Sequence, residues 1–197
     1  MSYLVPKKIL PEVICSLDDF YPDYKANGLD KLFYLKYKYP KFKVTLFTIP
    51  ERNEDSYTFF DEISKFDWIE LAVHGMFHDP INECTTWDGS RAEFVLSAME
   101  QMDCFVKVFK APGWHYNQAT YDQLKKRNWI CADLPDNRVN HPEGLKGYFT
   151  DHPMCVHGHT WNLNNPKPEY NNGIEQIIDR GVPFDENSKF YFVSEVI

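Results

Sequence analysis

The sequence predicts an α/β protein whose mostly parallel strands form a distorted, incomplete (β/α) barrel. Three observations support this. Short apolar runs recur along the 197 residues, stretches with helical spacing lie between them, and no internal repeat or composition shift divides the chain. Strands that alternate with helices favour a parallel sheet, and about seven strands suit a small or incomplete barrel. An open doubly wound sheet is the alternative. Residues 1–197 are expected to form one domain.

Seven runs are expected to be strands because they are apolar and rich in β-branched or aromatic residues. These runs are 13–17, 44–49, 68–73, 106–109, 129–132, 154–156 and 190–193. Helices are expected where apolar side chains recur at helical spacing. These stretches are 29–37, 91–102, 119–126 and 174–180, with a shorter one at 59–66. The elements therefore alternate along the chain, as a barrel of βα units requires.

Charge and composition exclude several classes of protein. With 21 basic and 29 acidic residues the net charge is −8, so the basic excess of a nucleic-acid binder is absent. No apolar signal region opens the chain and no stretch approaches the ~20 apolar residues of a membrane span, so we expect a cytoplasmic protein. The five cysteines lack C-x-x-C spacing, which favours reduced thiols over disulfides or a cysteine zinc knuckle. The lysine-rich stretch 31–43 is expected to be a solvated helix face and loop.

Ligand-type side chains follow five of the predicted strands. The carboxyl ends of parallel strands meet at one end of a barrel, so these side chains are expected to converge there. All seven histidines fall between residues 74 and 159, and four of them belong to two such clusters. The strand-end residues are Asp18 and Asp19, His74 and His78, Pro112 and Trp114, Asp133, and His157 and His159.

Two of these groups have the chemistry of a metal site. His74 and His78 are four residues apart, a spacing at which one helical turn directs both imidazoles to a divalent metal. Asp18 and Asp19 end a buried strand, where their mutual repulsion calls for a nearby cation. Two histidines and one carboxylate leave coordination positions open, as catalytic metals require.

This donor set suits the hydrolysis of an amide or ester. A metal lowers the pKa of bound water towards ~7, and a carboxylate next to the ligating one can accept the proton as the water attacks a carbonyl. A histidine of the second cluster, His157 or His159, can then protonate the departing group. A two-histidine, one-carboxylate iron oxygenase is disfavoured, since many of those have an antiparallel jelly roll.

The same residues, in this order, resemble the polysaccharide deacetylase family, also called the NodB-homology domain or carbohydrate esterase family four. Residues 16–20 (Ser-Leu-Asp-Asp-Phe) resemble its first motif, Thr-Phe-Asp-Asp-Gly, and residues 74–78 (His-Gly-Met-Phe-His) resemble its second, His-Ser/Thr-x-x-His. Residues 110–114 are similar to the Arg-Pro-Pro third motif, and residues 155–157 to the Leu-x-His fifth motif; Asp133 is a weak match for the fourth. Members of this family have a distorted β/α barrel.

The resemblance implies a role for each matched residue. Asp18 is then the general base, His157 the general acid, and Asp19, His74 and His78 the ligands of one divalent metal. Zinc is expected there, with cobalt, nickel, manganese and iron as alternatives. The groove of the family implies substrate contacts by Lys110, Pro112 and Trp114. His159 and Trp161 are added to these because of their position, and His159 also competes with His157 for the acid role.

The sequence departs from the family pattern at three positions. Phe20 stands where the family has Gly, and Gly75 where it has Ser or Thr, so the loop around the ligands must be held differently. Lys110 replaces an arginine that pairs with acidic partners near the base, and lysine lacks the planar fork of a guanidinium group. Trp87, Trp114 and Trp161 lie near strand ends and are candidates for stacking on a sugar ring or for packing in the core.

These observations predict a metal-dependent hydrolase that removes an acyl group, with acetyl expected, from an amide nitrogen of a sugar or sugar conjugate. One alternative is a saccharide-binding protein that keeps the metal cleft without catalysis. Another is an amide ligase or transferase that uses the same site. The oligomeric state is not indicated by the sequence.

Overall fold

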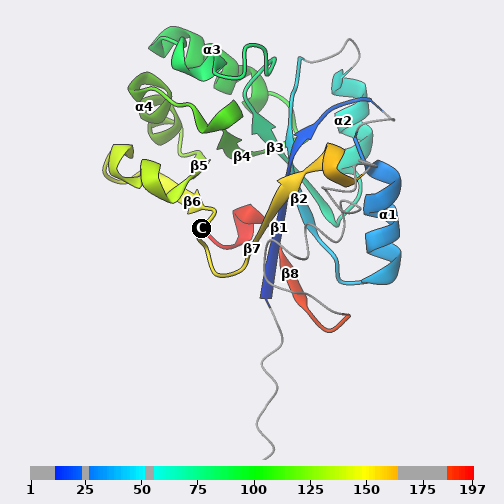
Figure 1. The fold of residues 1–197 in the computed structure, drawn as a ribbon. Coiled ribbons are helices and arrows are strands. Elements are labelled where there is room, and N and C mark those ends of the chain that lie inside the picture. The colour runs from blue at the N-terminus through cyan, green and yellow to red at the C-terminus, as the bar shows by residue number, and fades with distance from the viewer. Residues whose placement is uncertain (1–11, 24–26, 52–55, 164–185) are drawn as a thin grey trace, which may run out of the picture.

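The computed structural model describes residues 12–23, 27–51, 56–163 and 186–197, which form one curved sheet with helices on its outer face (Figure 1). The strands are β1 (Glu12–Phe20), β2 (Val44–Thr48), β3 (Ile69–His74), β4 (Phe105–Lys110), β5 (Ile130–Asp133), β6 (Lys146–Phe149), β7 (Cys155–His159) and β8 (Lys189–Tyr191). The helices are α1 (Leu29–Lys38), α2 (Ser56–Ser64), α3 (Gly89–Glu100) and α4 (Gln118–Lys126). No described helix is long and apolar enough to cross a membrane.

The sheet is an incomplete α/β barrel, as the sequence predicts. Its strands follow the order β6-β5-β4-β3-β2-β1-β7, every pair is parallel, and β6 and β7 stand at the two ends of that path. β8 pairs with the first residues of β1, before β2 joins that strand at Ser16. The open doubly wound alternative is therefore wrong. The expected helix at 174–180 lies outside the described residues.

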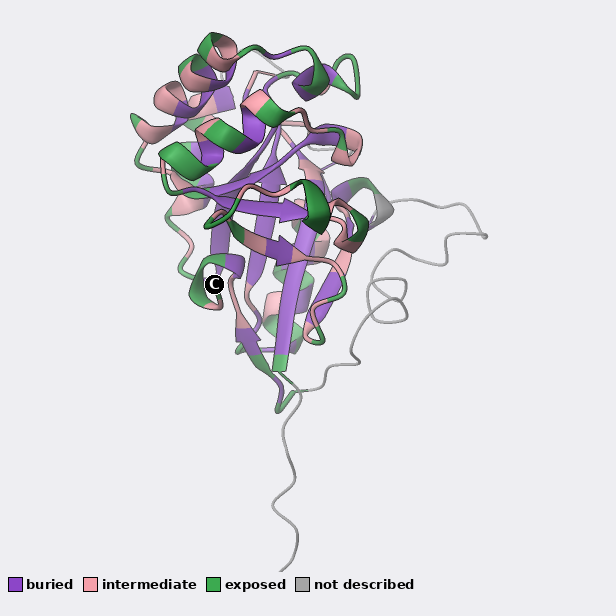
Figure 2. Cartoon of the chain, turned by 90° about the vertical axis from the view of Figure 1, so that its left-hand side faces the viewer, coloured by how far each residue is buried: buried purple, intermediate pink, exposed green. Residues whose placement is uncertain are grey.

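Side chains alternate between the two faces of the strands, and this alternation decides which of them enter the barrel. On β1, Val13, Cys15 and Leu17 face outward into the apolar layer beneath α1 and α2, whereas Ile14 faces the interior. A second outer layer packs beneath α3 and α4. The strands β2, β3 and β5 are buried on both faces, and many exposed residues lie on the outer surfaces of the helices (Figure 2).

The side chains of Asp88 and Asn117 cap the first turns of α3 and α4. The Asp88 side chain accepts a hydrogen bond from the backbone N–H of Arg91 at the start of α3. Asn117 accepts one from the N–H of Thr120 at the start of α4, and its amide donates to the Trp87 carbonyl. Such caps satisfy N–H groups that have no partner within the helix. Asn117 also ties the loop that follows β4 to the loop that follows β3.

The end of the chain closes the amino end of the barrel. Of the expected final strand 190–193, only Phe190 and Tyr191 are paired, as part of β8, and the chain then turns into η6 (Val193–Glu195). Val193 is fully buried among interior residues, and its N–H donates to Thr45 Oγ1 at 3.0 Å. The interior is thus filled at this end, while polar side chains occupy the opposite end.

Candidate metal and catalytic site

The ends of β1 and β3 bring Asp19, His74 and His78 together. Asp19 Oδ1 lies 3.5 Å from His74 Nε2 and 3.2 Å from His78 Nε2, and the three ligand atoms all lie within 4.8 Å of one another. Asp19 Oδ1 is buried and accepts no hydrogen bond from the residues described. A buried carboxylate oxygen without a donor is costly, and a cation between these atoms removes that cost. The three residues therefore fit a divalent metal.

A backbone contact prepares His74 for this role. Its Nδ1 lies 3.0 Å from the carbonyl oxygen of Lys110, so Nδ1 donates there and Nε2 keeps its lone pair. Metal-ligating histidines commonly donate their other nitrogen in this way. His74 is also nearly fully buried, which leaves its ring little freedom to turn. The imidazole is thus oriented by the neighbouring strand.

A bulge at the end of β1 places two consecutive carboxylates at the same end of the barrel. Side chains of a regular strand alternate, so Asp18 and Asp19 would point to opposite faces. The register of β1 against β2 shifts between Leu17 and Phe20, and Asp19 has a left-handed backbone with φ 62°. Phe20 then packs into the outer layer against Phe59. The aromatic residue at the family's glycine position therefore anchors the bulge from outside.

A buried carboxylate that the sequence did not single out holds the histidine loop. Glu83 Oε1 accepts hydrogen bonds from the backbone N–H groups of Met76 (2.8 Å), Phe77 (3.1 Å) and His78 (2.9 Å). Gly75, with φ 66°, passes so close that an added Cβ would lie 2.3 Å from Glu83 Oε1. This contact explains the glycine that departs from the family motif. Glu83 lies in a polar loop, so nothing in its sequence context pointed to it.

Lys110 lies behind Asp18 and is buried with it. Lys110 Nζ is 2.6 Å from Asp18 Oδ1, and it lies 3.8 Å above the Phe47 ring and 4.7 Å from the Trp114 ring. Burial alone would raise the pKa of Asp18, but the Lys110 ammonium and the facing histidines outweigh it, and that pKa is lowered. Asp18 is therefore a carboxylate at neutral pH, with one oxygen bound by a single ammonium donor.

His157 occupies the other side of Asp18. Its Nε2 lies 3.6 Å from Asp18 Oδ2, and its ring is 5.4 Å from that of Trp114. Burial, together with the Lys110 charge, lowers the pKa of His157 to about 3. His159, two residues further along β7, faces the same side, with its ring 5.7 Å from that of His157 and 5.2 Å from that of Trp161. His157 is thus the histidine in reach of Asp18.

The residues expected to bind substrate separate into two groups. The side chains of Lys110 and Pro112 are buried. Trp114, His159 and Trp161 are partly or well exposed at the carboxyl ends of the strands. Trp87, by contrast, is buried and packs against Phe109.

Asp133 does not join this site. It lies at the end of β5 on the outer face, where its carboxylate accepts from Tyr121 Oη (2.8 Å), Asn137 Nδ2 (2.7 Å) and the N–H of Leu134 (2.7 Å), with His141 Nε2 at 3.1 Å. Cys131, Asp133 and His141 do cluster closely enough for a metal. Both oxygens of Asp133, however, already have donors, unlike Asp19 Oδ1. In this second cluster, Asp133 therefore links α4 to the loop after β5 through hydrogen bonds.

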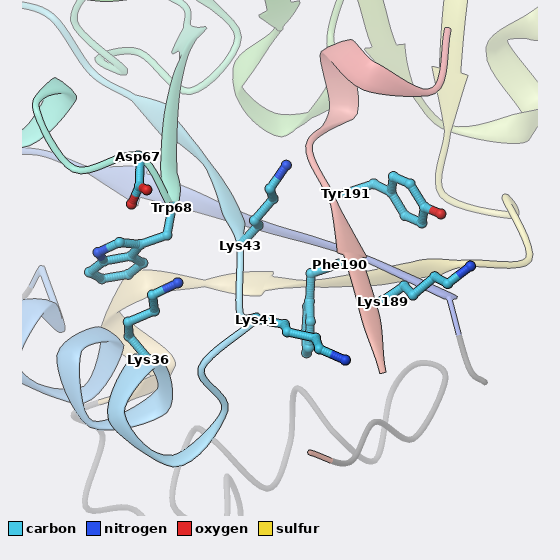
Figure 3. A pocket seen from close by; sticks show the side chains of 8 residues that line it. All are labelled: Lys36, Lys41, Lys43, Asp67, Trp68, Lys189, Phe190 and Tyr191. Atoms are coloured by element: carbon cyan, nitrogen blue, oxygen red, sulfur yellow. The ribbon is translucent and has the colours of Figure 1, made fainter. Parts of the chain in front are cut away.

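A lysine-lined pocket lies at the opposite end of the barrel (Figure 3). The Lys36 ammonium donates to the carbonyls of Pro40 and Phe42, and the Lys43 ammonium pairs with Glu195 at 2.6 Å. The amino groups of Lys41, Lys43 and Lys189 point in different directions, so they do not converge on one anion (Figure 3). Lys36 is the lysine that lies against Trp68, with its Nζ 5.8 Å from the centre of the Trp68 ring. No polar group of the metal site lines this pocket.

Comparison with solved structures places this fold. The Xyl-CE4 domain of a multidomain xylanase from the hindgut metagenome of Trinervitermes trinervoides is 17% identical, with a TM-score of 0.59 over 95% of this chain and 89% of that one. A family 4 acetyl xylan esterase from Clostridium thermocellum in complex with a cobalt ion gives 13% identity and a TM-score of 0.56, over 93% and 88%. The Bc1960 peptidoglycan N-acetylglucosamine deacetylase is 12% identical, with a TM-score of 0.57 over 94% of this chain and 87% of that one.

These neighbours are family 4 carbohydrate esterases and deacetylases. They share the fold at identities far below those that would show common activity, and a mutant of a CE4 family pseudoenzyme also resembles this chain (14% identity, TM-score 0.52, over 98% and 71%). No family model and no curated protein matches the sequence.

Proposed function

We propose that the chain is a metal-dependent hydrolase of the polysaccharide deacetylase type, which removes an acetyl group from an amide nitrogen of a sugar or sugar conjugate. One observation carries this proposal. Asp19 Oδ1, buried and without a donor among the described residues, faces two imidazole nitrogens, while a second carboxylate, Asp18, lies beside it. The carbohydrate esterases with the same fold support it.

Asp19, His74 and His78 would hold the metal, for which zinc is expected, with cobalt, nickel, manganese and iron as alternatives. When bound, such an ion polarises the acyl carbonyl and lowers the pKa of a water molecule towards ~7. All further steps are carried by side chains of this protein.

Asp18 and His157 would move the proton. Asp18 Oδ1 is held by Lys110, whereas Oδ2 faces His157 and is free to take the proton of the attacking water. His157 is neutral at pH 7 in the free protein because its pKa is about 3. It therefore acts as an acid only after it has received a proton, and Asp18 Oδ2 at 3.6 Å is its donor. His157 then protonates the departing amine.

The surroundings of Trp114 suit a sugar. A polar pocket of about 380 Å³ adjoins this residue and is lined by amide and aromatic side chains. Its other lining residues are His115, Tyr116, Asn117, Gln118, Tyr121, Asn137 and Asn140. Amide groups that bond to hydroxyls, together with rings that stack on the apolar face of a pyranose, are a common way to bind carbohydrate. Trp114 joins this pocket to the catalytic residues, because its ring lies 5.4 Å from that of His157, and the pocket would hold a sugar unit on the far side of Trp114 from His157.

Acetate release from N-acetylated and O-acetylated sugars, measured for the zinc- or cobalt-loaded protein, tests the proposal. Asp18→Asn should keep the metal and lower kcat by about 10²–10⁴-fold, because the general base is lost. Asp30→Asn, an exposed carboxylate on α1, is the matched control and should leave turnover unchanged. Turnover by Asp18→Asn at the level of the control would contradict the assignment. Sugar binding by the metal-loaded protein without acetate release would favour the saccharide-binding alternative. Product formation that requires a second substrate would favour the ligase or transferase.

A further inference from the structure

The second oxygen of the candidate metal ligand Asp19 is held by a tryptophan. The indole Nε1 of Trp161 donates to Asp19 Oδ2 at 3.0 Å. The residue before it, Thr160, donates from its hydroxyl to the backbone carbonyl of Asp19 at 2.8 Å. Two consecutive residues after β7 therefore bind the side chain and the backbone of the same aspartate. Its other oxygen, Oδ1, is left facing His74 and His78.

The segment that carries this indole is firmly seated. Trp161 belongs to η4 (Thr160–Leu163), in which Thr160 is fully buried and Leu163 packs into the outer apolar layer. Gly28, just before α1, approaches so closely that an added Cβ would lie 2.8 Å from the Thr160 carbonyl oxygen. Side chains on both sides of Trp161 thus fix its position. The ring itself is 38% exposed, so its place is set by these anchors and not by burial of the indole.

We infer that Trp161 is a positioning residue for the metal site, which it serves by holding Asp19 so that Oδ1 alone faces the two histidines. This inference rests on the proposed function, because it concerns the same metal. A carboxylate on a left-handed bulge could otherwise turn about its terminal bonds and offer either oxygen or both. Hydrogen bonds to the free atom of a metal ligand fix its orientation, and their loss typically weakens metal affinity 10–100-fold. The role differs from that of a sugar-stacking surface, which needs only the ring.

Titration calorimetry with Co²⁺ and with Zn²⁺ on the full chain tests the inference. Trp161→Phe keeps an aromatic ring but removes the N–H donor, and should raise the Kd for each metal by about 10-fold or more. Trp68→Phe is the matched control, because Trp68 packs against Phe33 and Phe66 at the opposite end of the barrel; its Kd should stay within twofold of the wild type. Circular dichroism on each variant verifies the fold.

A second variant separates the donor from the ring. 3-Benzothienylalanine at position 161 alone retains the two-ring shape and replaces the N–H with sulfur, so it should reproduce the loss seen with Trp161→Phe. Wild-type affinity in both position-161 variants would overturn the inference while leaving the metal site intact. Loss in Trp161→Phe but not in the benzothienyl variant would also overturn it, since the ring alone would then matter. Absence of metal binding by the wild-type protein would instead overturn the proposed function itself.

Discussion

Gly75 shows how a single residue adapts the metal-binding loop of this chain. Its φ of 66° lies in the left-handed region, and an added Cβ would lie 2.3 Å from Glu83 Oε1 and 2.6 Å from a ring carbon of Pro112. The polysaccharide deacetylase motif has Ser or Thr at this position. Here the loop is held from outside, by the three N–H groups that donate to Glu83 Oε1, and so the position has no room for a side chain.

Placing the serine of the deacetylase motif at position 75 should therefore destabilise this protein. Gly75→Ser is expected to lower the free energy of unfolding by about 1–3 kcal/mol, because a non-glycine residue is strained at this φ and its Cβ displaces Glu83. Gly89→Ala is the control: there an added Cβ meets only Gln123 Nε2 at 3.8 Å, and the first turn of α3 accepts alanine well. Urea unfolding measures both. Equal stability of Gly75→Ser and Gly89→Ala would show that the loop does not depend on the Glu83 contact.

At the scale of the elements, the contact between β3 and η6 contains a buried acid, Glu70, which forms no ion pair with any residue that the structure describes. The hydroxyl of Thr45 donates to Glu70 at 2.8 Å, and the hydroxyl of Ser194 donates to its other oxygen. Burial raises the pKa of Glu70, and these hydrogen bonds offset that rise only in part. The folded state therefore binds this proton more tightly than the unfolded state does.

The sign of the pH dependence follows from that difference. A carboxyl whose folded pKa is raised contributes most at low pH, and its contribution is lost as pH rises from the unfolded pKa of about 4.3 through the folded pKa. Glu70→Gln removes the titration and keeps an acceptor for Thr45. Its stability relative to the wild type should thus increase from pH 4 to pH 7, as measured by urea unfolding at both values. A difference that does not change with pH, or that changes in the opposite direction, would contradict this account of Glu70.

Most of the elements could be predicted, because the strands are continuous apolar runs and the helices have apolar side chains at helical spacing. The strand β6 was missed, since Tyr148 is its one fully buried side chain and Gly147 interrupts the apolar pattern. β8 was predicted too long, because the run 190–193 is apolar throughout. Val193, however, is buried in the barrel interior by a turn and not by strand pairing. Composition alone does not distinguish these two ways of burying an apolar residue.

At the scale of the whole molecule, the two ends of the barrel differ: the amino end is filled, and the carboxyl end carries the candidate site. The amino end of the sheet is filled by Val193 and by Glu70 with its partners Thr45 and Ser194. Asp18, Asp19, His74 and His157 gather at the carboxyl end. This convergence was predictable, because parallel strands bring their carboxyl ends together. The contacts that hold these residues were not, since Glu83 and the Trp161–Asp19 hydrogen bond join segments whose relative positions only the folded chain defines.

The central claim is that Asp19, His74 and His78 form one metal site. Metal content per chain, measured by mass spectrometry on protein purified without a metal-affinity tag, tests it most directly. The account predicts about one transition metal ion per wild-type chain and none in His74→Ala, while His141→Ala, in the outer cluster with Cys131 and Asp133, retains the wild-type content. No metal in the wild type after incubation with zinc, cobalt and nickel, or equal metal in wild type and His74→Ala, would contradict it.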